Sequence, residues 1–261
     1  MVSNEVKISL YGAASIVLLT IANVLESASY LSLVAIIPII IILKNSLSKK
    51  TGYWQWPVSL TLTLTVTYLL GQLITSQPIS FGILPYAIGL SLVTSLYWLV
   101  SRHLNSRIGL FTVILFWLAY DYLILSVFPD YSVYFVINSL ETSAFLPWTH
   151  SLGFFGVTLW ALVSNFLMAY ILFDPNTEYN IKMRWLSLIY ATLFITAPIW
   201  ILYFWPSSQV GISFDDMYRH YHDLPIDNLL YNERGEWLGR TSAWVAVLIV
   251  IYSLVKRKVK K

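Results

Sequence analysis

The polar residues with the clearest potential for chemistry gather near the C-terminal end of the chain. Two histidines and three aspartates occupy nine positions there: Asp215, Asp216, His220, His222 and Asp223. Imidazole nitrogens and carboxylate oxygens are ligands that zinc and other divalent metals take in proteins. The histidines share a face in an extended segment, whereas on a helix they point about 200° apart.

Two interpretations of this segment stay open. The first is a metal site whose candidate ligands are His220, His222, Asp216 and Asp223, with His150 as a further ligand if the fold brings it near. The second is an ordinary polar loop in which the histidines pair with carboxylates.

His150 is a second candidate for chemistry. It could act as a general base for acyl or phosphoryl transfer, with Ser143 or Ser151 supplying a hydroxyl, although neither serine lies in a recognisable catalytic motif. Gly153 and Gly156 follow it. These glycines are also typical of close helix packing, because small residues let membrane helices approach one another.

Asp121 is the only acidic residue deep within a long apolar run. A carboxylate in the membrane interior is costly, which favours a functional role for it. The alternative is an interfacial hydrogen bond, since the run ends only a turn or two further on.

Several classes of chemistry are excluded by composition. The chain has no cysteine, so it forms no disulfide, thiolate metal site or cysteine nucleophile. Its net charge is only +3, and the basic residues cluster only in the tail at 256–261. The charge pattern is not that of a nucleic-acid partner, and the tail is typical of an anchor at a membrane surface.

Composition also indicates which elements must position these residues. Of the 261 residues, 57% are hydrophobic and 11% charged, against about 25% charged in a soluble domain, and mean hydropathy is +0.68. This predicts an all-α polytopic membrane protein of one domain, residues 1–261. About eight apolar runs could cross a bilayer; they lie near 8–24, 29–43, 57–75, 82–100, 108–128, 153–173, 183–205 and 241–255.

Two of these runs carry local signals of their own. Pro38 predicts a kink or a break in the second run. Threonines alternate with apolar residues over 60–67, as in a strand, but an open strand cannot pair its backbone in lipid. We therefore expect a helix, whose threonine hydroxyls can bond to carbonyls one turn earlier.

The positive charges predict the orientation of the runs. All but three of the 16 basic residues fall on one side of the membrane if the N-terminus is cytoplasmic; the exceptions are Arg219, Arg234 and Arg240. By the positive-inside rule, both termini are expected in the cytoplasm. Segments 129–152 and 206–240 are then extracytoplasmic.

Three stretches carry a family resemblance. They are 30–40 (YLSLVAIIPII); 117–123 (WLAYDYL) with 128–129, 147–160 (PWTHSLGFFGVTLW) and Asn165 behind it; and 235–243 (GEWLGRTSA). In this order they resemble the membrane part of bacterial apolipoprotein N-acyltransferases, which add the third acyl chain to lipoproteins. The resemblance implies a lipid or substrate cavity opening to the outer leaflet and lined or shaped by Trp117, Asp121, Trp148, His150, Gly153 and Gly156.

The chain departs from this family where catalysis should lie. In the family, a nitrilase-like domain with a catalytic glutamate, lysine and cysteine lies between the last two helices. Here that interval, 206–240, is about 35 residues long and contains no lysine. With no cysteine in the chain, the thioester intermediate has no nucleophile.

The sequence therefore predicts a catalytically incomplete relative of these enzymes in a bacterial inner membrane. Its expected partners are membrane phospholipid, lipoprotein and a protein that supplies catalysis, and no cofactor is expected. Two alternatives remain open: a membrane enzyme that uses His150, His220 or His222 with a metal, and a structural subunit of an envelope complex.

Overall fold

The regular structure of this chain is helical, as its composition predicts. The computed structural model describes residues 4–47, 54–77, 82–103, 106–127, 146–173, 181–204 and 235–259. The helices are α1 (Asn4–Val24), the 3-10 helix η1 (Glu26–Leu33), α2 (Ile37–Leu47), α3 (Gln55–Ile74), α4 (Ile83–Ser95), α5 (Tyr97–His103), α6 (Ser106–Val127), α8 (Leu146–Phe173), α9 (Ile181–Phe204) and α12 (Glu236–Val259).

Six helical segments are long and apolar enough to cross a membrane. They are Glu5–Val24, Ser27–Asn45, Gln55–Ile74, Ile83–Ser101, Leu152–Phe173 and Glu236–Lys256. Two shorter apolar helical runs, Phe111–Ile124 and Trp185–Ile201, coincide with the remaining two runs expected from the sequence. The part of the chain that the structure describes is thus all-helical, with several candidate membrane spans.

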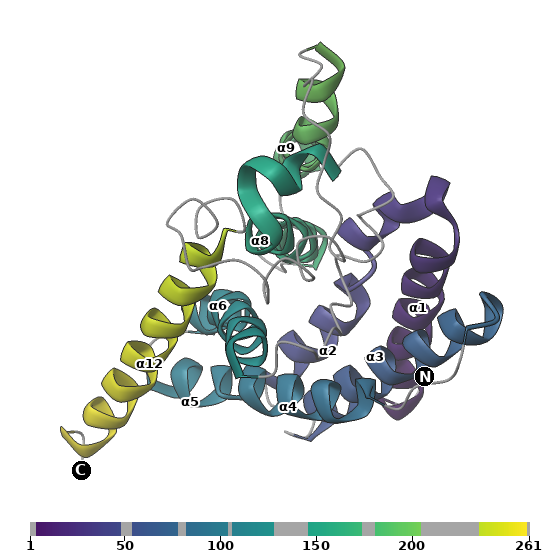
Figure 1. Ribbon diagram of the computed structural model, residues 1–261. Helices are drawn as coiled ribbons and strands as arrows, with labels where there is room; N and C mark the ends of the chain where they lie inside the picture. Colours follow the sequence, from purple (N-terminus) through teal and green to yellow (C-terminus); the bar gives the residue numbers. More distant parts are fainter. Residues whose placement is uncertain are drawn as a thin grey trace, which may run out of the picture.

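Helix α2 lies at the centre of the arrangement (Figure 1). It contacts α1, α3 and α8, while α1 packs on α3, α3 on α4, α4 on α6, and α6 on α12. Its apolar side chains are buried on every side, among them Ile39, Ile40 and Ile42. A helix that is apolar all round belongs in a core, which explains why this short helix is enclosed by the longer ones.

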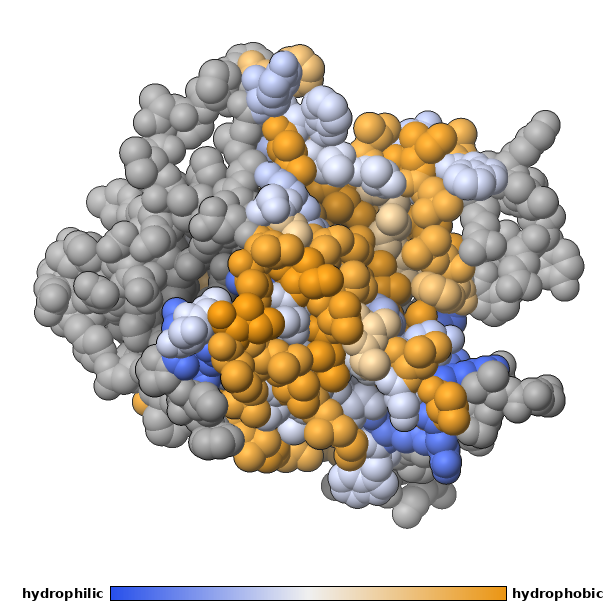
Figure 2. All heavy atoms as spheres, turned by 90° about the vertical axis from the view of Figure 1, so that its right-hand side faces the viewer, coloured by the Kyte–Doolittle hydropathy of each residue, from blue (hydrophilic) through white to orange (hydrophobic). Residues whose placement is uncertain are grey.

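The outer surfaces of the surrounding helices are apolar. Figure 2 shows hydrophobic side chains gathered over the side of the molecule formed by α1 and α3. Leu10 and Val17 of α1 and Leu62 and Leu73 of α3 are each more than half exposed. So much exposed apolar area is unusual for a soluble monomer and fits contact with lipid.

The threonine-rich segment is helical, as expected, but its hydroxyls do not bond as expected. Thr61 donates to Ser91 Oγ of α4 at 2.9 Å instead of to a carbonyl of its own helix. The buried hydroxyls of Thr63, Thr65 and Thr67 have no partner among the described residues. The prediction of back-bonding was wrong: Thr61 bonds to a polar group of a neighbouring helix, and the other three hydroxyls bond to no described group.

The second apolar run is broken, as Pro38 predicts. The 3-10 helix η1 ends at Leu33, a turn follows, and α2 starts at Ile37, so Pro38 falls in the first turn of α2. Proline is tolerated there because an N–H in that turn has no acceptor within the helix.

The side chain of Asn165 in α8 pairs the backbone at this break. Its Oδ1 accepts from Ile36 N–H at 2.9 Å, and its Nδ2 donates to Ser32 O at 2.8 Å and to Ala161 O at 2.9 Å. Asn165 is fully buried. One amide of α8 therefore binds both η1 and the turn that leads into α2, and it replaces hydrogen bonds that the break removes.

We expect Asn165→Leu to destabilise the protein strongly. The change leaves Ile36 N–H and Ser32 O unpaired in the interior, at a cost of roughly 2–4 kcal/mol in the free energy of unfolding. Chemical denaturation of the detergent-purified protein measures the loss. Ser164→Ala is the matched control, because the neighbouring hydroxyl of Ser164 is buried without a partner among the described residues. Equal losses in the two variants would contradict this role of Asn165.

Candidate functional site

Asp121 lies in α6 and is almost completely buried, with 2% of its surface exposed. The hydroxyl of Tyr86 in α4 donates to its Oδ1 at 2.6 Å. A buried carboxylate needs such a donor, because leaving it without hydrogen bonds is expensive. Tyr86 is therefore the hydrogen-bond partner of Asp121, which could not be identified from the sequence.

A second tyrosine makes further contacts between the same two helices. The Tyr120 hydroxyl donates to Tyr86 O at 3.1 Å, and the two rings lie 5.4 Å apart. Tyr120 can approach α4 because Gly89 lies beneath it; a Cβ on Gly89 would be 2.2 Å from the Tyr120 oxygen. Asp121 and its neighbour Tyr120 thus each make a hydrogen bond to Tyr86, and both bonds join α6 to α4.

The two candidate tryptophans pack between helices. Trp117 is 1% exposed and belongs to the hydrophobic core. Trp148 is partly buried, and its indole N–H donates to Pro198 O of α9 at 3.2 Å. Trp117 thus packs α6, and Trp148 packs α8, against neighbouring helices.

The candidate glycines lie where α8 meets the start of α12. Gly153 has φ 65° and ψ 178°, which produces a kink inside α8. A Cβ on Gly235, whose φ is +62°, would be 2.3 Å from Leu152 O and 3.4 Å from Gly153 Cα, and one on Gly156 would be 3.7 Å from Leu238 of α12. These contacts are those of close packing, the alternative interpretation of the glycines.

The histidine candidates are described only in part. His150 belongs to α8, but its side chain lies outside the described residues, as do His220, His222, Asp216 and Asp223. Within the described ranges, no group of three or more histidine, aspartate or glutamate side chains could hold a metal ion. The metal site of 215–223 stays a prediction.

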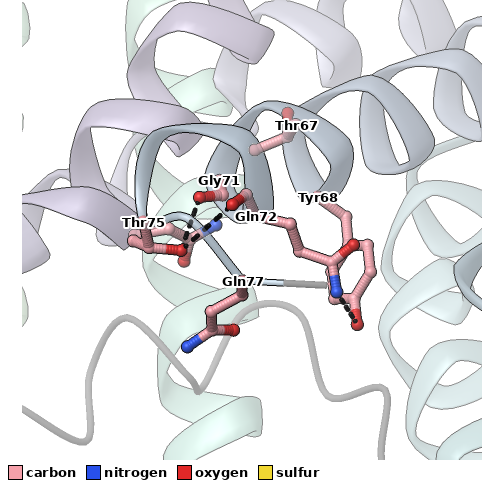
Figure 3. Close-up of a pocket in the computed structure, with 7 residues that line it drawn as sticks. Thr67, Tyr68, Gly71, Gln72, Thr75 and Gln77 are labelled. Carbon is pink, nitrogen blue, oxygen red and sulfur yellow. Dashed lines mark hydrogen bonds between the residues drawn. The ribbon is translucent and has the colours of Figure 1, made fainter. Parts of the chain in front are cut away.

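The structure adds a polar pocket between α1 and α3 that sequence reasoning missed (Figure 3). Its volume is about 220 Å³. The residues that line it are amides, hydroxyls and a glycine: Asn23, Thr67, Tyr68, Gly71, Gln72, Thr75 and Gln77. Exposed Thr75 and Gln77 lie on its outer side. None of the candidate residues from the sequence lines this pocket.

Some polar groups of the pocket are paired within it. Gln72 Nε2 donates to the Tyr68 hydroxyl at 2.9 Å, and the Thr75 hydroxyl donates to Gly71 O at 2.8 Å. Two other oxygens, Asn23 Oδ1 and Thr67 Oγ1, are buried and have no partner among the described residues. The exposed hydroxyl and amide groups of the lining can bond to a ligand or water directly, and the two buried oxygens can do so once neighbouring side chains move.

Apolar side chains border the pocket on the same helix. Leu70 and Ile74 of α3 are 37% and 56% exposed, and each follows a lining residue, Thr67 or Gly71, by three positions, so it lies beside that residue on the helix surface. Polar lining and exposed apolar flank together fit an amphiphile.

A sequence signal for the pocket did exist. Thr67, Gly71 and Thr75 are spaced four residues apart, as are Tyr68 and Gln72, so each set lies along one side of the helix.

We expect Tyr86→Phe to destabilise the protein by about 1–3 kcal/mol, because the buried Asp121 loses its donor. Asp121→Asn keeps an acceptor for the Tyr86 hydroxyl, so a smaller loss is expected. Denaturant titration measures both. Tyr122→Phe is the control, since the Tyr122 ring lies 6.2 Å from that of Phe155 and no hydrogen bond of its hydroxyl is found among the described residues. A loss from Tyr122→Phe as large as that from Tyr86→Phe would rule out a special role for the pair.

Comparisons of the chain with models of protein families, with curated proteins and with solved structures find no match. The geometry of the pocket between α1 and α3 is thus the main guide to function.

Proposed function

We propose that this chain is a multi-pass membrane protein that binds a membrane lipid, with the headgroup in the pocket between α1 and α3. The observation that carries the proposal is the combination of two buried, unpartnered oxygens in the pocket with the exposed leucine and isoleucine side chains beside it. A lipid satisfies both features at once, because its polar head and apolar chains are joined in one molecule.

The resemblance to apolipoprotein N-acyltransferases supports a role in lipoprotein maturation. On this proposal the chain handles phospholipid or lipoprotein acyl chains in a bacterial inner membrane. It is a catalytically incomplete relative, since the chain has no cysteine to form a thioester. A partner protein then supplies the catalytic residues.

The protein purified in mild detergent should retain about one lipid per chain. Native mass spectrometry measures the bound mass, and elemental analysis of the same sample measures metal. Retained lipid without stoichiometric metal supports the proposal. A preparation that retains no lipid when membrane lipid is added back contradicts it, and metal in a whole-number ratio would favour the histidine-dependent enzyme instead.

We further propose eight crossings with both termini in the cytoplasm. Because the chain has no cysteine, single cysteines can report the side of the membrane with an impermeant maleimide. Cysteines at Ser76 and Trp237 should label in intact cells, and those at Glu5 and Phe173 only after permeabilisation. The cysteine at Phe173 best distinguishes eight crossings from six. Phe173 lies on the cytoplasmic side if α6 and α9 both cross the membrane, and on the outer side if neither crosses. Labelling of Phe173→Cys in intact cells would contradict eight crossings.

A further inference from the structure

Among the described residues, none that lines the pocket between α1 and α3 is charged. The seven described lining residues carry amides or hydroxyls or are glycine. Proteins bind phosphate mainly through arginine, lysine or clustered N–H groups, and they bind quaternary ammonium through aromatic cages. Tyr68 is the one aromatic side chain among the described lining residues. The lining therefore does not match a phosphate or an ammonium headgroup.

The lining matches a group with several hydroxyls instead. A hydroxyl donates one hydrogen bond and accepts two, and amide side chains do both. Asn23 Oδ1 can accept, and Thr67 Oγ1 can accept and donate; both are buried without a partner among the described residues. Tyr68 accepts from Gln72, which leaves its own hydroxyl hydrogen to donate. Alternating donors and acceptors suit neighbouring hydroxyls of one ligand.

The size of the pocket limits what enters it. Its volume of about 220 Å³ lies below the ~300–1,000 Å³ typical of sites that enclose a drug-sized ligand. A glycerol unit or a single sugar ring is of suitable size, whereas a whole lipid is not. The acyl chains would then lie along the exposed flank of α3 next to Thr67 and Gly71, where Leu70 and Ile74 are 37% and 56% exposed.

We infer that this pocket binds the uncharged polyol headgroup of a membrane lipid. The inference rests on the proposed lipid-binding function and names the headgroup class. Two sources share this chemistry: a sugar linked directly to diacylglycerol, and the terminal glycerol of phosphatidylglycerol, whose phosphate stays outside the pocket.

Two glycines provide a matched pair of variants. A Cβ built on Gly71, in the pocket, meets no heavy atom within 4 Å, and the same holds for Gly12 of α1, which does not line the pocket. Gly71→Leu therefore fills the pocket without a clash at Cβ, and Gly12→Leu makes the same change elsewhere. Both replace glycine within a helix, which raises helix propensity. Thr67→Val is a second variant, which removes one buried hydroxyl at nearly constant size.

The test uses the whole chain in detergent and four lipids with identical acyl chains. Native mass spectrometry measures the binding of each lipid. The probes are monoglucosyldiacylglycerol, phosphatidylglycerol, phosphatidylethanolamine and phosphatidylcholine. We expect one or both polyol lipids to bind about tenfold or more tightly than the two amine lipids, as one or two additional buried hydrogen bonds would give. Gly71→Leu should abolish this preference, Thr67→Val should reduce it several-fold, and Gly12→Leu should preserve it.

The outcomes separate the two proposals. Preference for the glycolipid alone identifies a sugar, preference for phosphatidylglycerol alone identifies its glycerol, and either supports the inference. Equal binding of all four lipids, or a preference that survives in both pocket variants, overturns the headgroup assignment but not lipid binding. Failure of the unmodified protein to bind any of the four overturns lipid binding itself.

Discussion

The position of the central helix α2 depends on the side-chain amide of Asn165. Inside a membrane no water is available to hydrogen-bond the backbone. A break in a helix is therefore stable there only if the protein supplies the hydrogen-bond partners. Asn165 pairs Ile36 N–H and Ser32 O on either side of the break between η1 and α2. The surrounding helices pack around a core that includes the isoleucines of α2, so their arrangement depends on this junction as well.

The buried polar groups of this protein are of two kinds. Those that have hydrogen-bond partners within the protein are called closed sets here, and those with a buried atom that lacks a partner are called open sets. Asn165 has its amide oxygen and nitrogen paired, and the carboxylate of Asp121 has a short hydrogen bond from Tyr86. These closed sets fix one helix against another and stand apart from the polar pocket. Asn23 and Thr67 form an open set: like Thr63, Thr65 and Ser164 they have a buried oxygen without a partner among the described residues, but these two residues also line a pocket. A buried polar atom without a partner has lost its water and gained no hydrogen bond in return. Such an atom is therefore a stronger indicator of a bound ligand than a paired one.

The sequence predicts this fold far better than its polar contacts. Long apolar runs determine where helices form, and Pro38 indicates the break, because both signals act within one segment. The partner of Asp121 is 35 positions away in α4, and Thr61 bonds to Ser91 across to α4, so these pairings depend on packing. The pocket was missed for the same reason: its α3 residues have a visible spacing, but Asn23 joins them only when α1 packs on α3.

The lining of the pocket also bears on whether chemistry takes place there. A threonine or tyrosine hydroxyl is a weak nucleophile unless a base removes its proton, and general bases are histidine, carboxylate or lysine side chains in most enzymes. Within the described part of the lining there are hydroxyls at Thr67, Tyr68 and Thr75 but none of these bases. The same amides and hydroxyls are well suited to hold a polyol without reacting with it. The described lining is therefore suited to binding a lipid, as the proposed function requires.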